Sequence, residues 1–96
     1  MNRSLALSLL AQHRAALATR FGVTALALLG STVRGSAGSA SDVDVLVAFD
    51  GPATSARYFG VQFYLEDFLG CTVDLVTENA LRPELRPAIK SEAVYV

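Results

Sequence analysis

The sequence predicts a small α+β domain, α/β-like in its order of elements, with a mixed sheet of three or slightly more strands flanked by about four helices. Two observations predict this fold. Apolar residues recur at helical spacing in some segments and form short continuous runs in others, and glycines separate the two kinds of segment. At 96 residues the chain is long enough for one core, so we expect a single domain over residues 1–96.

Two long segments have the apolar spacing of amphipathic helices. Residues 4–20 are rich in Leu and Ala, and Gly22 follows, as is common where a helix ends. Residues 55–69 carry apolar side chains at helical spacings and end before Gly70. The second segment also contains an aromatic stripe, which we expect in the helix core: Tyr58, Phe63, Tyr64 and Phe68.

Three short apolar runs predict buried strands, over residues 23–29, 43–49 and 72–77. The second run stops at the turn signal Asp50-Gly51-Pro52. A short helix is expected after the third run, from near Pro87 to near Ala93, because proline is tolerated in a first helical turn. The apolar tail over residues 94–96 is expected either to dock on the domain or to contact a partner.

Composition restricts the classes of function. The chain is 52% hydrophobic with a mean hydropathy of +0.41, so we expect an oligomer or a complex that covers part of this apolar surface. A net charge of −1 and a pI of about 5.7 argue against direct binding of nucleic acid or of an anionic membrane. The start of the chain imitates a signal peptide poorly, since Gln12, His13 and Arg14 interrupt its apolar run, and no run approaches the roughly 20 residues that span a bilayer.

Cysteine and histidine each occur once. Cys71 is expected to be a small core residue beside the third strand, and a single cysteine forms no intrachain disulfide, which fits a reducing cytoplasm. His13 has no potential metal ligand next to it in the sequence. We therefore expect it to lie on the surface or to face a partner.

The segment after the first predicted strand is suited to binding phosphate. Gly30 and Ser31 are followed by one expected helical turn over residues 32–35, so backbone N–H groups and a hydroxyl could meet an anion without a bulky side chain in the way. An ordinary strand-to-helix turn is the alternative interpretation. Arg34 is suited equally to a phosphate contact and to a salt bridge that holds the loop.

Three aspartates suggest a metal site. Asp42 and Asp44 are two residues apart at the start of the second strand, so their side chains project to the same face and repel unless a cation neutralises them. Hard oxygen ligands without a His or Cys cluster favour Mg²⁺ or Mn²⁺. Asp74 interrupts the apolar third strand and would complete the site if that strand lies beside the second. The alternatives are turn residues for Asp42 and Asp44, and a solvent-facing edge position for Asp74.

The combined pattern, which stands here as GSTVRGSAGSASDVD, resembles the minimal nucleotidyltransferase branch of the DNA polymerase beta-like nucleotidyltransferase superfamily. The resemblance implies a nucleotidyltransferase fold and the transfer of AMP from ATP to a hydroxyl, with two Mg²⁺ ions for which Mn²⁺ is a substitute. It assigns Gly30 and Ser31 to the nucleotide phosphates, and Arg34 to the outgoing pyrophosphate or to the loop. Asp42 and Asp44 match the paired metal ligands, and Asp74 matches the third, catalytic carboxylate.

The same resemblance implies a partner. Minimal nucleotidyltransferases commonly act as antitoxins of HEPN-domain toxins and can adenylylate a tyrosine on them, which gives a type VII-like antitoxin in a hetero-oligomer. Two alternatives remain open at this point. One is a catalytically idle antitoxin that neutralises its toxin by binding, and the other is a small-molecule nucleotidyltransferase of the antibiotic-modifying type.

Overall fold

The computed structural model describes residues 2–29 and 43–96. Its elements, in chain order, are α1 (Arg3–Phe21), β1 (Val23–Leu29), β2 (Val43–Phe49), α3 (Ser55–Leu69), β3 (Val73–Thr77), the 3₁₀ helix η1 (Glu78–Ala80), α4 (Arg86–Glu92) and β4 (Val94–Tyr95). Every helix and strand predicted within these residues is present. The helical turn expected over residues 32–35 lies outside them.

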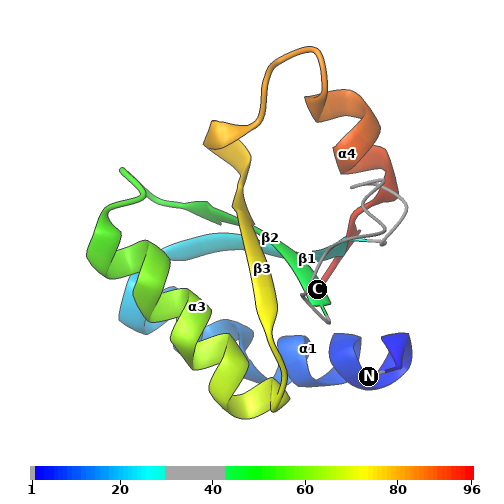
Figure 1. Cartoon of the computed structure of the whole chain (residues 1–96). Coiled ribbons are helices and arrows are strands. Elements are labelled where there is room, and N and C mark those ends of the chain that lie inside the picture. Colours follow the sequence, from blue (N-terminus) through cyan, green and yellow to red (C-terminus); the bar gives the residue numbers. More distant parts are fainter. Residues whose placement is uncertain (1, 30–42) are drawn as a thin grey trace.

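The four strands form one mixed sheet in the order β3-β2-β1-β4 (Figure 1). Strands β2 and β3 are parallel, whereas β1 pairs antiparallel with β2 on one side and with β4 on the other. The predicted mixed sheet is therefore confirmed. The C-terminal tail docks on the domain as the edge strand β4, with the amide of Val96 donating to the carbonyl of Leu26 at 3.0 Å.

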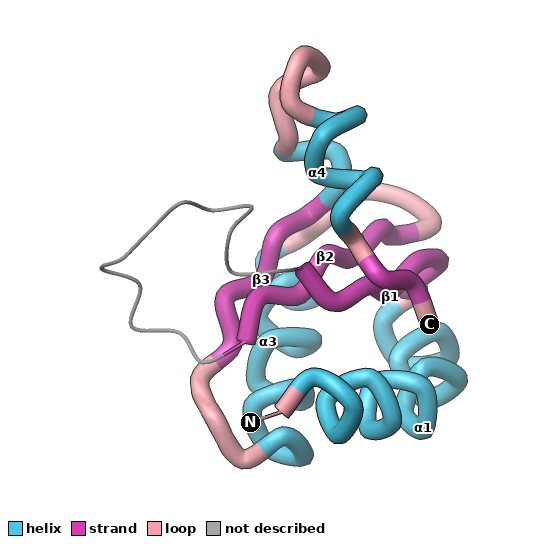
Figure 2. The backbone as a smooth tube through the Cα atoms, turned by 90° about the vertical axis from the view of Figure 1, so that its right-hand side faces the viewer, coloured by secondary structure: helices cyan, strands magenta, loops and turns pink. Residues whose placement is uncertain are grey.

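Helices cover the two faces of the sheet unequally. Figure 1 shows α1 and α3 together below the sheet and α4 above it, and the same layers are visible from the side in Figure 2. The main core lies between the sheet and the two long helices, whose fully buried side chains include Leu10, Leu17, Val61 and Leu65. A smaller cluster on the other face joins Leu46 to Ile89 of α4.

Both long helices end as the sequence predicts. Gly22 and Gly70 have φ angles of 73° and 71°, a left-handed conformation that favours glycine, and each N–H bonds back to the last turn of its helix. At the other end of α1, the side chain of Asn2 accepts a hydrogen bond from the amide of Leu5 at 2.8 Å. Local capping chemistry therefore sets these boundaries.

One expectation about a side chain is wrong, and a second holds only in part. Phe63 is not in the core, because 63% of it is exposed, on the side of α3 opposite Val61. His13 does not project freely from the surface. Its Nδ1 lies 2.9 Å from the hydroxyl of Tyr64, and its ring stacks on Phe68 with 3.9 Å between centroids. Contacts between α1 and α3, which helical periodicity does not reveal, hold this histidine. None of the helices described is long and apolar enough to cross a membrane.

Candidate active site

Asp44 of β2 and Asp74 of β3 are partners in the parallel ladder between the two strands. Neighbouring strands lie about 4.8 Å apart, so the two side chains leave the sheet next to each other. A further backbone bond joins the strands here, from the amide of Val43 to the carbonyl of Thr72 at 3.3 Å. The condition on which the sequence prediction depended, that the second and third strands are neighbours, is therefore met.

Both carboxylates lie on the sheet face that α1 and α3 do not cover. The residues on either side of Asp44, Val43 and Val45, belong to the core beneath the sheet, and successive side chains of a strand point to opposite faces. Asp44 and Asp74 are half-buried, and the Oδ1 atom of Asp44 is shielded from solvent. Burial strengthens the mutual repulsion of two adjacent carboxylates, which favours a bound cation.

Strand β3 is held in place by side chains of α3. The Oε2 atom of Glu66 accepts a hydrogen bond from the amide of Val73 at 3.0 Å, and Nε2 of Gln62 donates to the carbonyl of the same residue at 3.4 Å. The hydroxyl of Tyr58 donates to the carbonyl of Leu75 at 2.9 Å. These three bonds bracket Asp74 and fix its backbone. This role of α3 was not predicted from the sequence, where the polar positions on an otherwise apolar helix were the available signal.

The helix α4 partly covers the aspartate-bearing face. Ile89 packs on the cluster that contains Leu29 and Leu46, and Leu29 is the ladder partner of Asp44. The Nζ atom of Lys90 lies 3.0 Å from Oε1 of Glu78, which follows β3. The hydrogen bond and the charge of Glu78 raise the pKa of Lys90 above its ordinary value. This ion pair ties α4 to the end of the strand that carries Asp74.

The structure covers two of the six predicted site residues. Asp44 and Asp74 are brought together, whereas Gly30, Ser31, Arg34 and Asp42 lie outside the described residues. Within residues 2–29 and 43–96 no three His, Cys, Asp or Glu side chains form a potential metal site. The two carboxylates that are described offer only oxygen donors on one face, and such donors fit Mg²⁺ or Mn²⁺.

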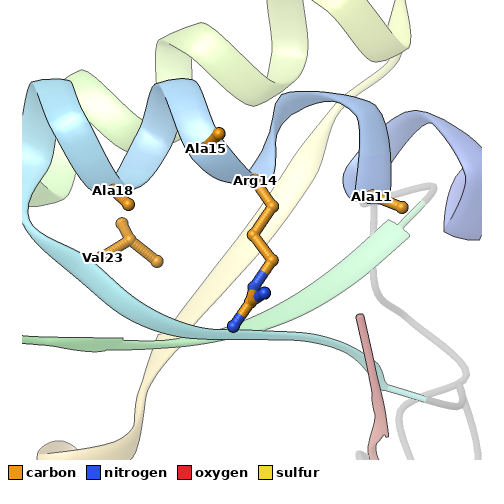
Figure 3. A pocket seen from close by; sticks show the side chains of 5 residues that line it. All are labelled: Ala11, Arg14, Ala15, Ala18 and Val23. Atoms are coloured by element: carbon orange, nitrogen blue, oxygen red, sulfur yellow. The ribbon is translucent and has the colours of Figure 1, made fainter.

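A separate shallow cavity of about 370 Å³ lies between α1 and β1 (Figure 3). Its lining comprises Ala11, Arg14, Ala15, Ala18 and Val23. Val23 belongs to the core beneath the sheet, so this cavity is on the opposite side from Asp44 and Asp74. It has one cationic side chain and no carboxylate, and we do not associate it with the candidate active site.

A family model described as a nucleotidyltransferase domain matches residues 10–96. The chain is also 39% identical, over 93% of its length and 90% of the relative's, to the protein adenylyltransferase MntA of Thermococcus cleftensis. The residues that the family model matches include all six predicted site residues.

Two solved structures resemble the fold. One is a candidate minimal nucleotidyltransferase that is 36% identical, with a TM-score of 0.69 and 93% of each chain covered. The other is the complex of a tri-AMPylated Shewanella oneidensis HEPN toxin with its MNT antitoxin, at 17% identity and a TM-score of 0.64, covering 92% of this chain and 69% of that one. At this low identity the second likeness concerns the fold alone.

Proposed function

Since the chain belongs to the nucleotidyltransferase domain family and to its minimal branch, we propose that it is a magnesium-dependent adenylyltransferase. It transfers AMP from ATP to a tyrosine hydroxyl of a HEPN-domain toxin and thereby acts as the antitoxin. The observation that carries the proposal is the register of Asp44 with Asp74 on one sheet face. The relative named protein adenylyltransferase and the toxin complex of the structural neighbour support the choice of reaction and partner.

Three aspartates of this chain would hold the metal. Asp44 and Asp74 supply adjacent carboxylates from two neighbouring strands, and Asp42 is two residues before Asp44 in the sequence. When bound, Mg²⁺ neutralises phosphate charge and lowers the pKa of the acceptor hydroxyl. The carboxylates of Asp44 and Asp74, fixed on neighbouring strands, hold their negative charges in one arrangement and so orient the reactants.

In the transfer step, the acceptor oxygen attacks the α-phosphorus of ATP while the bond from that phosphorus to the pyrophosphate oxygen breaks. The proton of the hydroxyl passes to the carboxylate of Asp74. Gly30 and Ser31 hold the phosphates through backbone N–H groups and a hydroxyl, and Arg34 holds the departing pyrophosphate or the loop. The tethers from α3 to Val73 and Leu75 keep Asp74 in position for this role.

The test is label transfer from α-labelled ATP to the protein encoded next to this chain, with Mg²⁺ present, followed by intact-mass analysis of that partner. Asp44→Asn and Asp74→Asn should each lower transfer by at least about a hundredfold, because electrostatic stabilisation is usually a large catalytic contribution. Asp50→Asn is the matched control. Asp50 follows β2 at the end of the strand that is far from Asp44, is 56% exposed and pairs with Arg57, so its loss should leave transfer unchanged.

Two results would contradict the proposal. If the aspartate variants neutralise the toxin as well as the original chain and no label is transferred, the chain acts by binding alone. If label appears on a small hydroxyl compound but on no protein, the small-molecule alternative is correct.

An Arg-x4–6-His motif in the neighbouring protein would support a HEPN-type partner.

A further inference from the structure

Two phenylalanines stand exposed on the outer side of α3. Phe59 is 49% exposed and Phe63 is 63% exposed, and their rings stack with 6.2 Å between centroids and 25° between planes. They are one helical turn apart, opposite Val61 and Leu65, which are completely buried. We call Phe59 and Phe63 the phenylalanine pair. Large apolar side chains that are exposed together usually mark a protein contact.

The charges on α3 indicate what covers the phenylalanine pair. A helix carries partial positive charge at its N-terminus and partial negative charge at its C-terminus. The first turn of α3 contains no acidic residue and the last turn no basic one. Asp67 lies exposed in that last turn, where its negative charge meets the negative end of the helix and is unfavourable. Thr54 caps the N-terminus with a neutral hydroxyl, so neither end turn of α3 contains a charged residue that complements the helix dipole.

We propose that α3 is the contact surface between two copies of this chain, packed antiparallel across the phenylalanine pair. Positions 59 and 63 are equally far from position 61, as are positions 55 and 67. A twofold axis at the level of position 61, on the exposed side of α3, therefore stacks Phe59 of one copy on Phe63 of the other. The same axis brings Asp67 of each copy to Ser55, the first residue of the other α3, where the positive end of the helix has no acidic residue of its own.

The shape of α3 permits this arrangement. Ala56 lies one turn before Phe59 on the exposed side, and a small side chain there allows the axes to approach within the usual 8–10 Å. A helix of 15 residues is only about 22 Å long, so the buried area is small and the dimer is expected to be weak. Because α3 and the two aspartates are on opposite faces of the sheet, both candidate active sites stay open in the dimer.

The first test measures self-association of the isolated full chain by sedimentation velocity over a concentration series. The original chain should show a monomer–dimer equilibrium, and Phe63→Gln should raise the dimer dissociation constant by about tenfold or more, because each dimer loses two buried rings. Leu85→Gln is the matched control, since Leu85 is 48% exposed but lies outside α3 and should not change the equilibrium. Far-ultraviolet circular dichroism should show that each variant remains folded.

Charge changes test the antiparallel arrangement. Asp67→Lys and Ser55→Glu each improve the match between charge and helix end within one copy, so neither should unfold the chain. Each should nevertheless weaken the dimer severalfold. Ser55→Glu sets a carboxylate against Asp67 of the other copy, and Asp67→Lys sets a cation against the positive end of the other α3. The double variant should recover most of the lost affinity, since Glu at position 55 faces Lys at position 67 of the other copy.

Three outcomes would overturn the proposal. The chain could remain monomeric at every concentration. Asp67→Lys could leave dimerisation unchanged while Phe63→Gln abolishes it, which would exclude the antiparallel arrangement. Phe63→Gln could instead weaken only the association with a toxin partner, which would make the phenylalanine pair part of a heteromeric contact. None of these outcomes depends on nucleotide transfer, so the test is independent of the proposed function.

Discussion

The hydroxyl of Tyr58 donates a hydrogen bond to the carbonyl of Leu75 across 2.9 Å, one residue beyond Asp74. Strand β3 is at the edge of the sheet, where backbone groups that face away from β2 lack a strand partner. Side chains of α3 satisfy these groups, including both the amide and the carbonyl of Val73. The helix therefore protects the sheet edge and positions a predicted catalytic carboxylate with the same bonds.

Replacing Tyr58 by Phe should lower the free energy of unfolding by about 1 kcal/mol, because a half-buried carbonyl loses its partner. Urea denaturation measures this change. Tyr95→Phe is the control, since Tyr95 is 43% exposed and its hydroxyl makes no hydrogen bond within the described residues. Equal stability of the two variants would show that the bond to Leu75 contributes nothing.

Gly60→Ala should destabilise the chain although alanine is the better helix former. A Cβ atom at position 60 would lie 2.5 Å from Cε1 of Phe21, so the Phe21 ring or the two helices would have to shift. Overpacking of this kind costs about 1–3 kcal/mol, against a helix-propensity gain of about 1 kcal/mol. Thermal unfolding of Gly51→Ala provides the comparison, because a Cβ there meets its nearest atom at 3.6 Å. A melting temperature for Gly60→Ala at or above the original would contradict this account.

Asp44→Asn should raise the melting temperature without metal and abolish any further rise on adding Mg²⁺. Removing one of two adjacent carboxylates relieves a repulsion of about 0.2–1 kcal/mol, and the same change removes a proposed ligand. Differential scanning fluorimetry of the original chain and the variant, each with and without Mg²⁺, measures both effects. If Mg²⁺ stabilises the two proteins equally, the carboxylates of Asp44 and Asp74 do not bind it.

Glu78→Gln should lower the pKa of Lys90 towards its ordinary value of 10.5, because the hydrogen bond and charge of Glu78 raise it. Lys90 is the only lysine of the chain, so its side-chain NMR signal can be followed without ambiguity. A pKa raised by folding stabilises the native state fully below pH 10.5 and loses that contribution as the pH rises through the folded value. The original chain should therefore lose more stability than Glu78→Gln over that alkaline interval. An unchanged titration midpoint in the variant would mean that the ion pair does not form in solution.

Much of the fold was predictable because it depends on local chemistry. The bounds of β1, β2 and α3 match the expected ranges, since glycine caps and apolar runs set them without reference to the rest of the chain. The pairing of Asp42 with Asp44 was predicted for the same reason, because a spacing of two on a strand directs both side chains to one face, and it stays a prediction since Asp42 lies outside the described residues. Periodicity on its own placed Phe63 wrongly, since an apolar residue is compatible with either side of a helix.

By itself, the sequence determined the order and bounds of the elements and the types of residue that suit a metal and a phosphate. Only the tertiary structure decided that β3 lies parallel to β2 in the register that sets Asp74 beside Asp44. It also decided that the tail becomes β4, and that His13 packs between α1 and α3. These are contacts between residues distant in the chain, and their register depends on how whole elements pack, which no local pattern specifies.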